Sequence, residues 1–250
     1  MVDGRGLADG RGLADGLAVI HDLGSGTGSM GRWLGALLPG PQHWIMHDRD
    51  ADLLELAAAD MIHAAVDGAP VTVETRLGDI SRLTAADLSG AALVTASALL
   101  DLLTAEEVER VAAACVGAGC PALLTISVVG HVELTPADPL DAEIAEAFNA
   151  HQRRTVGGRR LLGPDAVEVA AEAFDRLGAS VRVRPSPWRL GADEAELASE
   201  WFKGWVGAAC EQRPELTGAA ADYARRRLAE ASAGRLGVVV HHSDLFARCE

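Results

Sequence analysis

The sequence has little positive charge. Lys203 is its single lysine, and lysine and arginine together number 22 against 36 acidic residues, so the formal net charge of the 250-residue chain is −14. Proteins that bind nucleic acid usually carry a basic stripe that neutralises phosphates. The charge balance therefore argues against a nucleic acid partner.

Long apolar runs are also missing. The longest stretches, at 91–100 and 121–129, are much shorter than the roughly 20 apolar residues that a membrane-spanning helix needs. The beginning of the chain shows no apolar signal region. We therefore expect a cytoplasmic protein with no membrane partner.

Cysteine is sparse and scattered. Cys115, Cys120, Cys210 and Cys249 form no C-x-x-C pair, and no His/Cys cluster has the spacing of a zinc site. The neighbouring histidines at 241 and 242 lack a third ligand at metal spacing. The sequence thus predicts reduced structural thiols and no metal.

Short apolar segments alternate with helical patterns along most of the chain. Such alternation is typical of a doubly wound α/β fold, whose buried parallel strands are nearly continuous apolar runs. The length suffices for one large domain, and no linker divides it. The expected strands are 18–23, 43–48, 71–77, 91–97, 122–129, 180–184 and 236–241, and the expected helices are 30–38, 51–66, 106–116, 140–150, 164–177, 193–210 and 214–231.

The first residues repeat a glycine-rich unit, "DGRGLA", with a period of six. Two glycines per repeat make a helix costly. We therefore expect residues 1–17 to be a flexible leader, and residues 18–250 to form a single domain.

The first predicted strand runs into "IHDLGSGTGSMG" at 20–31. Ligands of open α/β sheets bind beyond the carboxyl ends of the strands, and a glycine turn there lets a nucleotide approach the backbone. No G-K-[ST] follows, so this is no Walker loop. The segment fits both the dinucleotide fingerprint G-x-G-x-x-G and the different pattern D-x-G-x-G-x-G.

Acidic residues help to separate these two interpretations. Asp48 ends the second predicted strand, where a carboxylate binds ribose hydroxyls of either NAD or S-adenosylmethionine (SAM). Asp22, just before the glycines, would repel a pyrophosphate but suits the amino group of a methionine. "LGDI" at 77–80 puts another acid after the third strand, where an adenine amino group could be bound.

Four segments, "VIHDLGSGTGSMGRWL", "HWIMHDRD", "RLGDI" and "LVTASALLDLL", resemble in order and spacing the first four motifs of class I SAM-dependent methyltransferases of the small-molecule type. The resemblance covers residues 18–130. It implies a Rossmann-like, seven-stranded, mostly parallel sheet whose last strand is antiparallel. It also implies SAM as cofactor, leaving S-adenosylhomocysteine as product, with Asp22, Gly24, Ser25 and Gly26 at the methionine end, Asp48 at the ribose, Arg49, Asp79 and Ile80 at the adenine, and Ser97 near the sulfonium.

The sequence departs from this family in two long insertions. Residues 130–163 and 191–233 follow strands that should end at the ligand edge, so we expect both insertions to cover the pocket as a lid. The place after the fourth strand lacks the [DNS]-P-P-[YFW] motif of methyltransferases that act on bases or glutamine. No cysteine lies where cytosine C5 enzymes require one.

The insertions contain the candidate substrate residues. Trp201 and Trp205 share a helix face at i, i+4 and form either core packing or an aromatic pocket wall. Arg153 and Arg154, followed by Arg159 and Arg160, form either a solvated loop or a site for an anionic substrate.

His131, directly after the fifth strand, is the best candidate for a general base, and His151 is second, because imidazole titrates near neutral pH. The alternative for each is an ordinary loop histidine.

The sequence therefore predicts a SAM-dependent methyltransferase of a small-molecule metabolite, anionic or aromatic, with O-methylation slightly favoured. Two alternatives remain: an NAD(P)-dependent oxidoreductase, and a methyltransferase-like protein that binds SAM without chemistry. The expected assembly is a monomer or a homodimer.

Overall fold

A sheet of nine strands forms the centre of the computed structural model, which describes residues 13–14 and 16–249. Across the sheet the strands follow one another in the order β4 (Val71–Leu77), β3 (Gln42–Asp48), β2 (Leu17–Leu23), β5 (Leu93–Ser97), β6 (Ala122–Thr135) and β11 (Gly237–Arg248). Two strands, β9 (Ser180–Pro185) and β10 (Trp188–Leu190), follow each other along the outer edge of β11. The short β1 (Leu13–Ala14) pairs with β2.

Neighbouring strands from β4 to β6 are parallel, whereas β11 runs antiparallel between β6 and β9. This confirms the predicted mostly parallel α/β sheet with an antiparallel last strand. Of the predicted leader, residues 1–12 and 15 lie outside the described residues.

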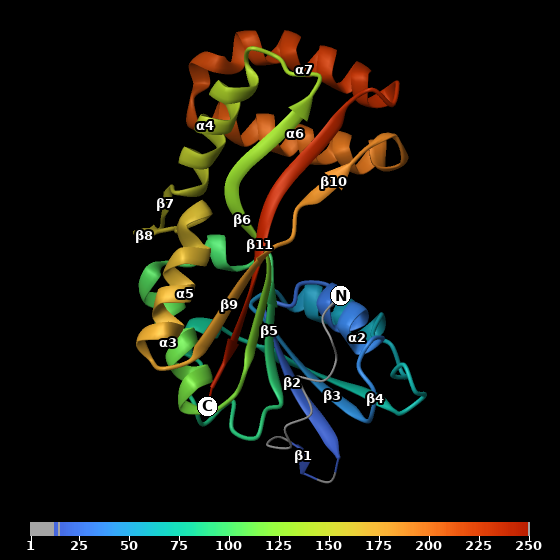
Figure 1. Ribbon diagram of the computed structural model, residues 1–250, viewed down its shortest axis with the longest axis vertical. Helices are drawn as coiled ribbons and strands as arrows, with labels where there is room; N and C mark the ends of the chain where they lie inside the picture. The colour runs from blue at the N-terminus through green and yellow to red at the C-terminus, as the bar shows by residue number, and fades with distance from the viewer. Residues whose placement is uncertain (1–12, 15, 250) are drawn as a thin grey trace.

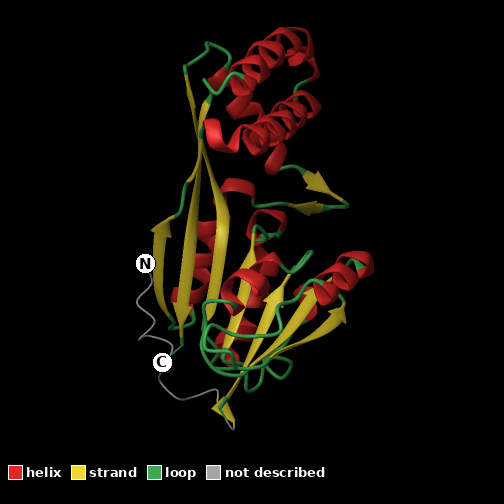
Figure 2. Cartoon of the chain, turned by 90° about the vertical axis from the view of Figure 1, so that its right-hand side faces the viewer, coloured by secondary structure: helices red, strands yellow, loops and turns green. Residues whose placement is uncertain are grey.

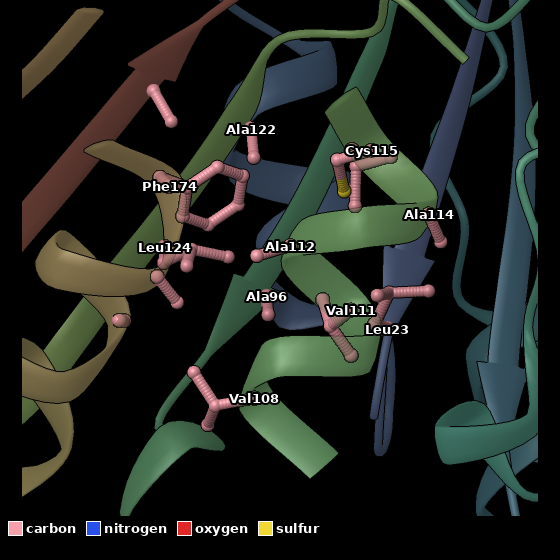
Figure 3. Packing of buried hydrophobic residues seen from close by; sticks show 14 of the residues in the cluster. Leu23, Ala96, Val108, Val111, Ala112, Ala114, Cys115, Ala122, Leu124 and Phe174 are labelled. Carbon is pink, nitrogen blue, oxygen red and sulfur yellow. The ribbon is translucent and has the colours of Figure 1, made fainter. Parts of the chain in front are cut away.

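Helices cover both faces of the sheet. On one face, α1 (Ser29–Gly35) and α2 (Ala51–Ala59) pack on a core that contains Ile20 and Trp44. On the other face, α3 (Ala105–Gly117) and α5 (Ala166–Arg176) bury a cluster seen in Figure 3, where small side chains such as Ala96 and Ala112 bring helix and strands close together. The strand residues alternate between these two cores, as a sheet buried on both sides requires.

Local signals in the sequence set several helix ends. Thr104 and Glu107 form a capping box at the start of α3, and the Asp50 carboxylate accepts N–H bonds at the start of α2. The prediction that α2 extends to residue 66 was wrong, because it ends at Ala59. After it, the N–H of Val71 bonds to the carbonyl of His63, which turns the chain back toward β4.

The strands β6 and β11 are much longer than predicted. The predicted end of β11 at 241 is wrong, because β11 continues to Arg248 and pairs there with both β6 and β9. The predicted end of β6 at 129 is wrong, because β6 goes on pairing with β11 from Val132 opposite Val240 to Thr135 opposite Gly237. This extension leads to three helices, α4 (Asp141–Gln152), α6 (Ala195–Gln212) and α7 (Thr217–Ser232), which we call the lid helices. Figures 1 and 2 show them at the far end of the long strands.

The lid helices have an apolar core of their own. Phe202, Trp205 and Tyr223 are almost fully buried there, and Phe202 contacts both of the other rings. Apolar side chains of the extended strands, Leu134, Val238 and Val240, belong to the same cluster. The strand extensions therefore serve as the floor on which the lid helices pack. None of the described helices combines the length and apolar composition needed to cross a bilayer.

A buried arginine joins the lid helices. Arg227 of α7 is 2% exposed and donates to both carboxylate oxygens of Asp141 on α4, each at 2.7 Å. It also donates to the carbonyl of Pro136 and to Glu230. Tyr223 donates to the same Asp141 at 2.6 Å.

Replacing Arg227 with Met should leave the Asp141 carboxylate poorly compensated. We expect Arg227→Met to lower the free energy of unfolding by about 3–5 kcal/mol, the usual cost of removing one partner of a buried ion pair. Urea unfolding checks this. Arg225→Met is the matched control, since Arg225 on the same helix pairs with Asp222 in solvent and should change stability by less than about 0.5 kcal/mol. Equal effects of both variants would contradict the prediction.

Candidate active site

The glycine segment forms a tight turn between β2 and α1. Gly24, Gly26 and Gly28 have φ values of 61°, 53° and 81°, a region that side chains disfavour. A Cβ added at Gly28 would lie 3.3 Å from the backbone of Ala57, so this glycine allows α2 to pack closely. A Cβ at Gly26 would meet nothing within 4 Å, so space beside Gly26 is open to a ligand.

Asp48 holds this turn in place. Its Oδ2 accepts the N–H of Gly26 at 2.8 Å, and its Oδ1 accepts the N–H of Asp50 at 3.1 Å. The structure thereby brings together the ends of β2 and β3, as the strand assignment predicted. Arg49, the next residue, is exposed.

Asp22 lies beside them on β2 and is only 1% exposed. Its Oδ1 accepts a hydrogen bond from the Thr95 hydroxyl at 2.7 Å, whereas its Oδ2 has no partner in the described part of the chain. The pKa of Asp22 is raised to about 7, chiefly by burial, with the Thr95 hydrogen bond opposing the rise and the charge of Asp48 adding to it. A buried carboxylate with a free oxygen is suited to a cationic group. The Ser25 hydroxyl is likewise buried without a partner among the described residues.

The remaining predicted cofactor residues lie at the ends of β4 and β5. Asp79 is exposed, and hydrogen bonding from the Ser81 side chain and from the Ser81 N–H lowers the pKa of its carboxyl. Ile80 is buried in the core with Leu23. Ser97 ends β5 and is partly buried.

Two residues have strained backbones: Ala98, directly after β5, and Ile126, within β6. Ala98 has a φ of 51° and Ile126 a φ of 55°, which is uncommon for any residue with a side chain and rarest for a β-branched one. The N–H of Ile126 donates to Asp244 Oδ1 at 3.0 Å, and the same oxygen accepts the Ser186 hydroxyl at 2.7 Å. Such strain persists only where the surroundings enforce it, and it concentrates at functional sites.

Ile126 lies in the first of two bulges in β6. Two residues of β6 lie opposite Asp244 alone, between the pairs Leu124–Leu245 and Ser127–Ser243. Further along, residues 129–131 lie opposite His241 alone. Bulges bend a strand and redirect its side chains. Here they occur where β6 leaves the sheet for the lid helices.

A cavity of about 190 Å³ lies at these bulges. Ala98 and Asp101 border it on the side of the glycine turn, and Trp201 and Phe148 border it from the lid helices. Trp188 packs against His242 with ring centroids 5.1 Å apart. The full lining is Ala98, Asp101, Ile126, Val128, Gly130, His131, Val132, Phe148, Asn149, Gln152, Trp188, Trp201, Val240, His241 and His242.

Several polar atoms of the cavity are available to a ligand. Gln152 Oε1 and His242 Nδ1 are buried and have no partner in the described residues. Burial lowers the pKa of His242, so its ring is neutral near pH 7. Asp101, in the turn after β5, is partly buried, and desolvation raises its pKa to about 6. Sequence reasoning missed Asp101, although its place four residues after Ser97 is a usable signal.

The predicted substrate residues separate into two groups. Trp201 lines the cavity. Trp205 does not; it is buried in the core of the lid helices, where its ring stacks on that of Trp201 with the ring centroids 5.3 Å apart. Arg153 is held in a bidentate pair by Asp165. Arg154 donates to the ring and carbonyl of His151. Arg159 pairs with Glu107, so two of the four arginines already bind carboxylates.

The histidines predicted as bases also have acidic neighbours. His131 Nε2 lies 3.3 Å from Glu133 Oε1, and His241 donates to that same oxygen at 2.7 Å. Hydrogen bonding, first to His241 and also to His131, lowers the pKa of Glu133. His151 lies 3.1 Å from Glu211 and does not line the cavity.

No protein-family model matches this sequence, and comparison with curated proteins finds no match. Solved structures do match. A Bacillus halodurans protein described as a methyltransferase is 16% identical, with a TM-score of 0.51 and 98% of each chain covered. The YcgJ protein of Bacillus subtilis is 14% identical, with a TM-score of 0.52 and 94% of this chain and 93% of that chain covered.

A SAM-dependent methyltransferase from Methanosarcina mazei is 11% identical, with a TM-score of 0.50 and the same coverage, 94% and 93%. The chain has the class I SAM-dependent methyltransferase fold. In this fold, the glycine turn and the cavity lie at the carboxyl edge of the parallel strands, where open α/β sheets bind ligands.

Asp22 should make stability depend on pH. Its raised pKa means that the folded chain binds more protons than the unfolded chain between about pH 4 and pH 7. Stability is therefore lost as pH rises through 7, by at most about 4 kcal/mol. Since Asn carries no charge, Asp22→Asn should lose less stability between pH 5 and pH 8 than the wild type, measured by urea unfolding.

Asp60→Asn, at an exposed position, is the control and should follow the wild type. If Asp22→Asn also paralleled the wild type at both pH values, the buried charge would not be the cause.

Proposed function

We propose that this protein is a SAM-dependent methyltransferase that acts on a small molecule, with a hydroxyl oxygen as the favoured methyl acceptor. The observation that carries the proposal is the contiguity of two sites. The segment after β5 borders both sites: Leu99 packs against Gly24 of the glycine turn, and Ala98 and Asp101 line the cavity. The fold supports the same proposal.

The residues at the glycine turn fit the methionine and ribose parts of SAM. Open space at Gly26 allows a ligand to contact the backbone, and the free Oδ2 of Asp22 offers an acceptor for an ammonium group. Asp48, partly exposed, would hold the ribose hydroxyls. Bound SAM would supply a methyl group already activated by its sulfonium.

The adenine end would lie toward β4. Ile80 gives a buried apolar base to this turn, and the exposed Asp79 and Arg49 are the polar groups available there. Ser97, at the end of β5, lies between the two sites and would face the sulfonium.

An NAD(P)-dependent oxidoreductase is less well supported. The buried carboxylate of Asp22 beside the turn would oppose a pyrophosphate. The antiparallel β11 between β6 and β9 also differs from the doubly wound dinucleotide fold, in which the sixth strand continues the sheet directly.

The cavity supports a small substrate with an apolar or aromatic body. Its volume of about 190 Å³ is below the roughly 300–1,000 Å³ of drug-sized sites. Trp201, Phe148 and Trp188 would contact the body of the substrate, and Gln152 and His242 would bind its polar groups. A cavity shaped in this way beside the cofactor residues supports an enzyme over a SAM-binding protein without chemistry.

Methyl transfer needs alignment of the acceptor with the sulfonium, and a base when the acceptor is a hydroxyl. We assign the base to Asp101, because its raised pKa of about 6 makes it a better proton acceptor near neutrality than an ordinary aspartate. In this role the Asp101 carboxylate would accept the proton of the acceptor hydroxyl, while bound SAM would supply the methyl group to the oxygen and leave as S-adenosylhomocysteine. His131, predicted for this role from the sequence, is exposed and paired with Glu133.

The assignment can be tested by isothermal titration. SAM and S-adenosylhomocysteine should each bind with one site per chain, whereas NAD should give no heat of binding. Binding of NAD with no response to SAM would overturn the proposal.

Gly26→Ala should weaken SAM binding at least about tenfold, because its methyl group would enter the space left for the cofactor and the residue would be strained at φ 53°. Gly40→Ala is the matched control. Gly40 also has a positive φ, 82°, and open space, but it precedes β3 at the opposite edge of the sheet. Both variants are titrated with SAM. If backbone strain alone weakened binding, both variants would lose SAM affinity to the same extent; loss only in Gly26→Ala would show that the added methyl group fills the ligand space.

A further inference from the structure

Three side chains that bind metals well meet at the mouth of the cavity. His131 and Glu133 lie two residues apart on β6, and His241 lies on β11, 108 residues after Glu133. One ligand atom from each residue lies within 4.8 Å of the others. The three side chains are 63%, 56% and 28% exposed, so a metal ion could enter from solvent.

The distances between these atoms already resemble those in a coordination shell. A metal bound at about 2.0–2.1 Å holds neighbouring ligand atoms about 2.9 Å apart at right angles and about 3.4 Å apart in a tetrahedron. Glu133 Oε1 lies 2.7 Å from His241 Nε2 and 3.3 Å from His131 Nε2. Small side-chain movements would therefore place all three around one ion.

The second bulge of β6 creates this arrangement. Between the pairs Val128–His242 and Val132–Val240, three residues of β6 face the single residue His241. Gly130, with a φ of 73°, makes the bend, and its carbonyl accepts a bond from Asn149 of α4 at 2.8 Å. As a result, the rings of His131 and His241 lie 4.5 Å apart.

We propose that His131, Glu133 and His241 bind one divalent transition-metal ion. Two imidazoles and one carboxylate are the ligand set of open zinc and non-haem iron sites, in which the remaining positions take water or substrate. Since His131 and His241 also line the cavity, those positions are available to an oxygen of the small substrate. The proposal concerns metal binding and does not depend on SAM.

The test uses the full chain, freed of metal by a chelator and dialysed, and titrated with Zn²⁺ by calorimetry. We expect one Zn²⁺ per chain in the wild type. His241→Ala and Glu133→Gln should each weaken binding at least about tenfold, because loss even of a group that only supports a ligand costs 10–100-fold. The side chains of His241 and Glu133 are 28% and 56% exposed, so their replacement should leave the fold intact. A melting temperature equal to that of the metal-free wild type would verify that each variant folds.

His43→Ala is the control, since His43 lies 3.5 Å from Glu74 in a surface pair that has no third candidate ligand among the described residues. This variant should bind Zn²⁺ as the wild type does. Co²⁺ gives a second measurement. Its absorption spectrum should show nitrogen and oxygen ligands without a thiolate charge-transfer band, which separates this site from the cysteines. No binding by the wild type, equal binding by all variants, or a thiolate band would each overturn the proposal.

Discussion

One hydrogen bond, from the N–H of Ile126 to the Asp244 carboxylate at 3.0 Å, lies in β6 and β11 between the part that belongs to the central sheet and the part that carries the lid helices. On one side of it, β6 and β11 belong to the sheet that carries the glycine turn. On the other side, the same two strands form the floor of the lid helices. Asp244 satisfies the backbone of a β-branched residue at φ 55°, a conformation that costs about 1–3 kcal/mol. Without this bond, the bend in β6 would leave a partly buried N–H unpaired.

The bend determines the shape of the cavity. Regular pairing between β6 and β11 would alternate their side chains evenly between the two faces. Ile126, Val128, Gly130 and Val132 follow this alternation and line the cavity from one face, and the second bulge adds His131 to the same wall. The proposed active site therefore combines several unfavourable features: Ala98 and Ile126 at positive φ, and the uncompensated oxygen of Asp22. The two apolar cores of the sheet and the core of the lid helices offset these costs, as is usual where a fold departs from its lowest energy at a functional site.

The sequence predicts those parts of the structure that depend on neighbouring residues. The boundaries of β4 and the glycine turn follow from short patterns of apolar and glycine residues. The lengths of β6 and β11 do not follow from such patterns. Residues 130–135 contain polar residues and a glycine that are equally common in a loop, and only their pairing with β11 makes them part of a strand. Glu133 and His241 are 108 residues apart in the sequence. They form a hydrogen bond only because β6 and β11 pair in a register that contains the bulge. Asp101 was missed because its raised pKa arises from burial, which the sequence does not reveal.

The proposed cofactor site and the cavity are built from different parts of the chain. The proposed cofactor residues come from the first 100 residues and are positioned by parallel strands whose ends meet at one edge. The cavity, in contrast, draws on β6, α4, β10, α6 and β11, which are brought together by the strand extensions. Substitutions at Phe148, Trp201 or Trp188 change the cavity without touching the glycine turn, because no backbone of β2 or β3 lines it. In the proposed enzyme, such substitutions would change substrate choice and leave the proposed cofactor site intact, provided that Asp244 keeps the bend in β6.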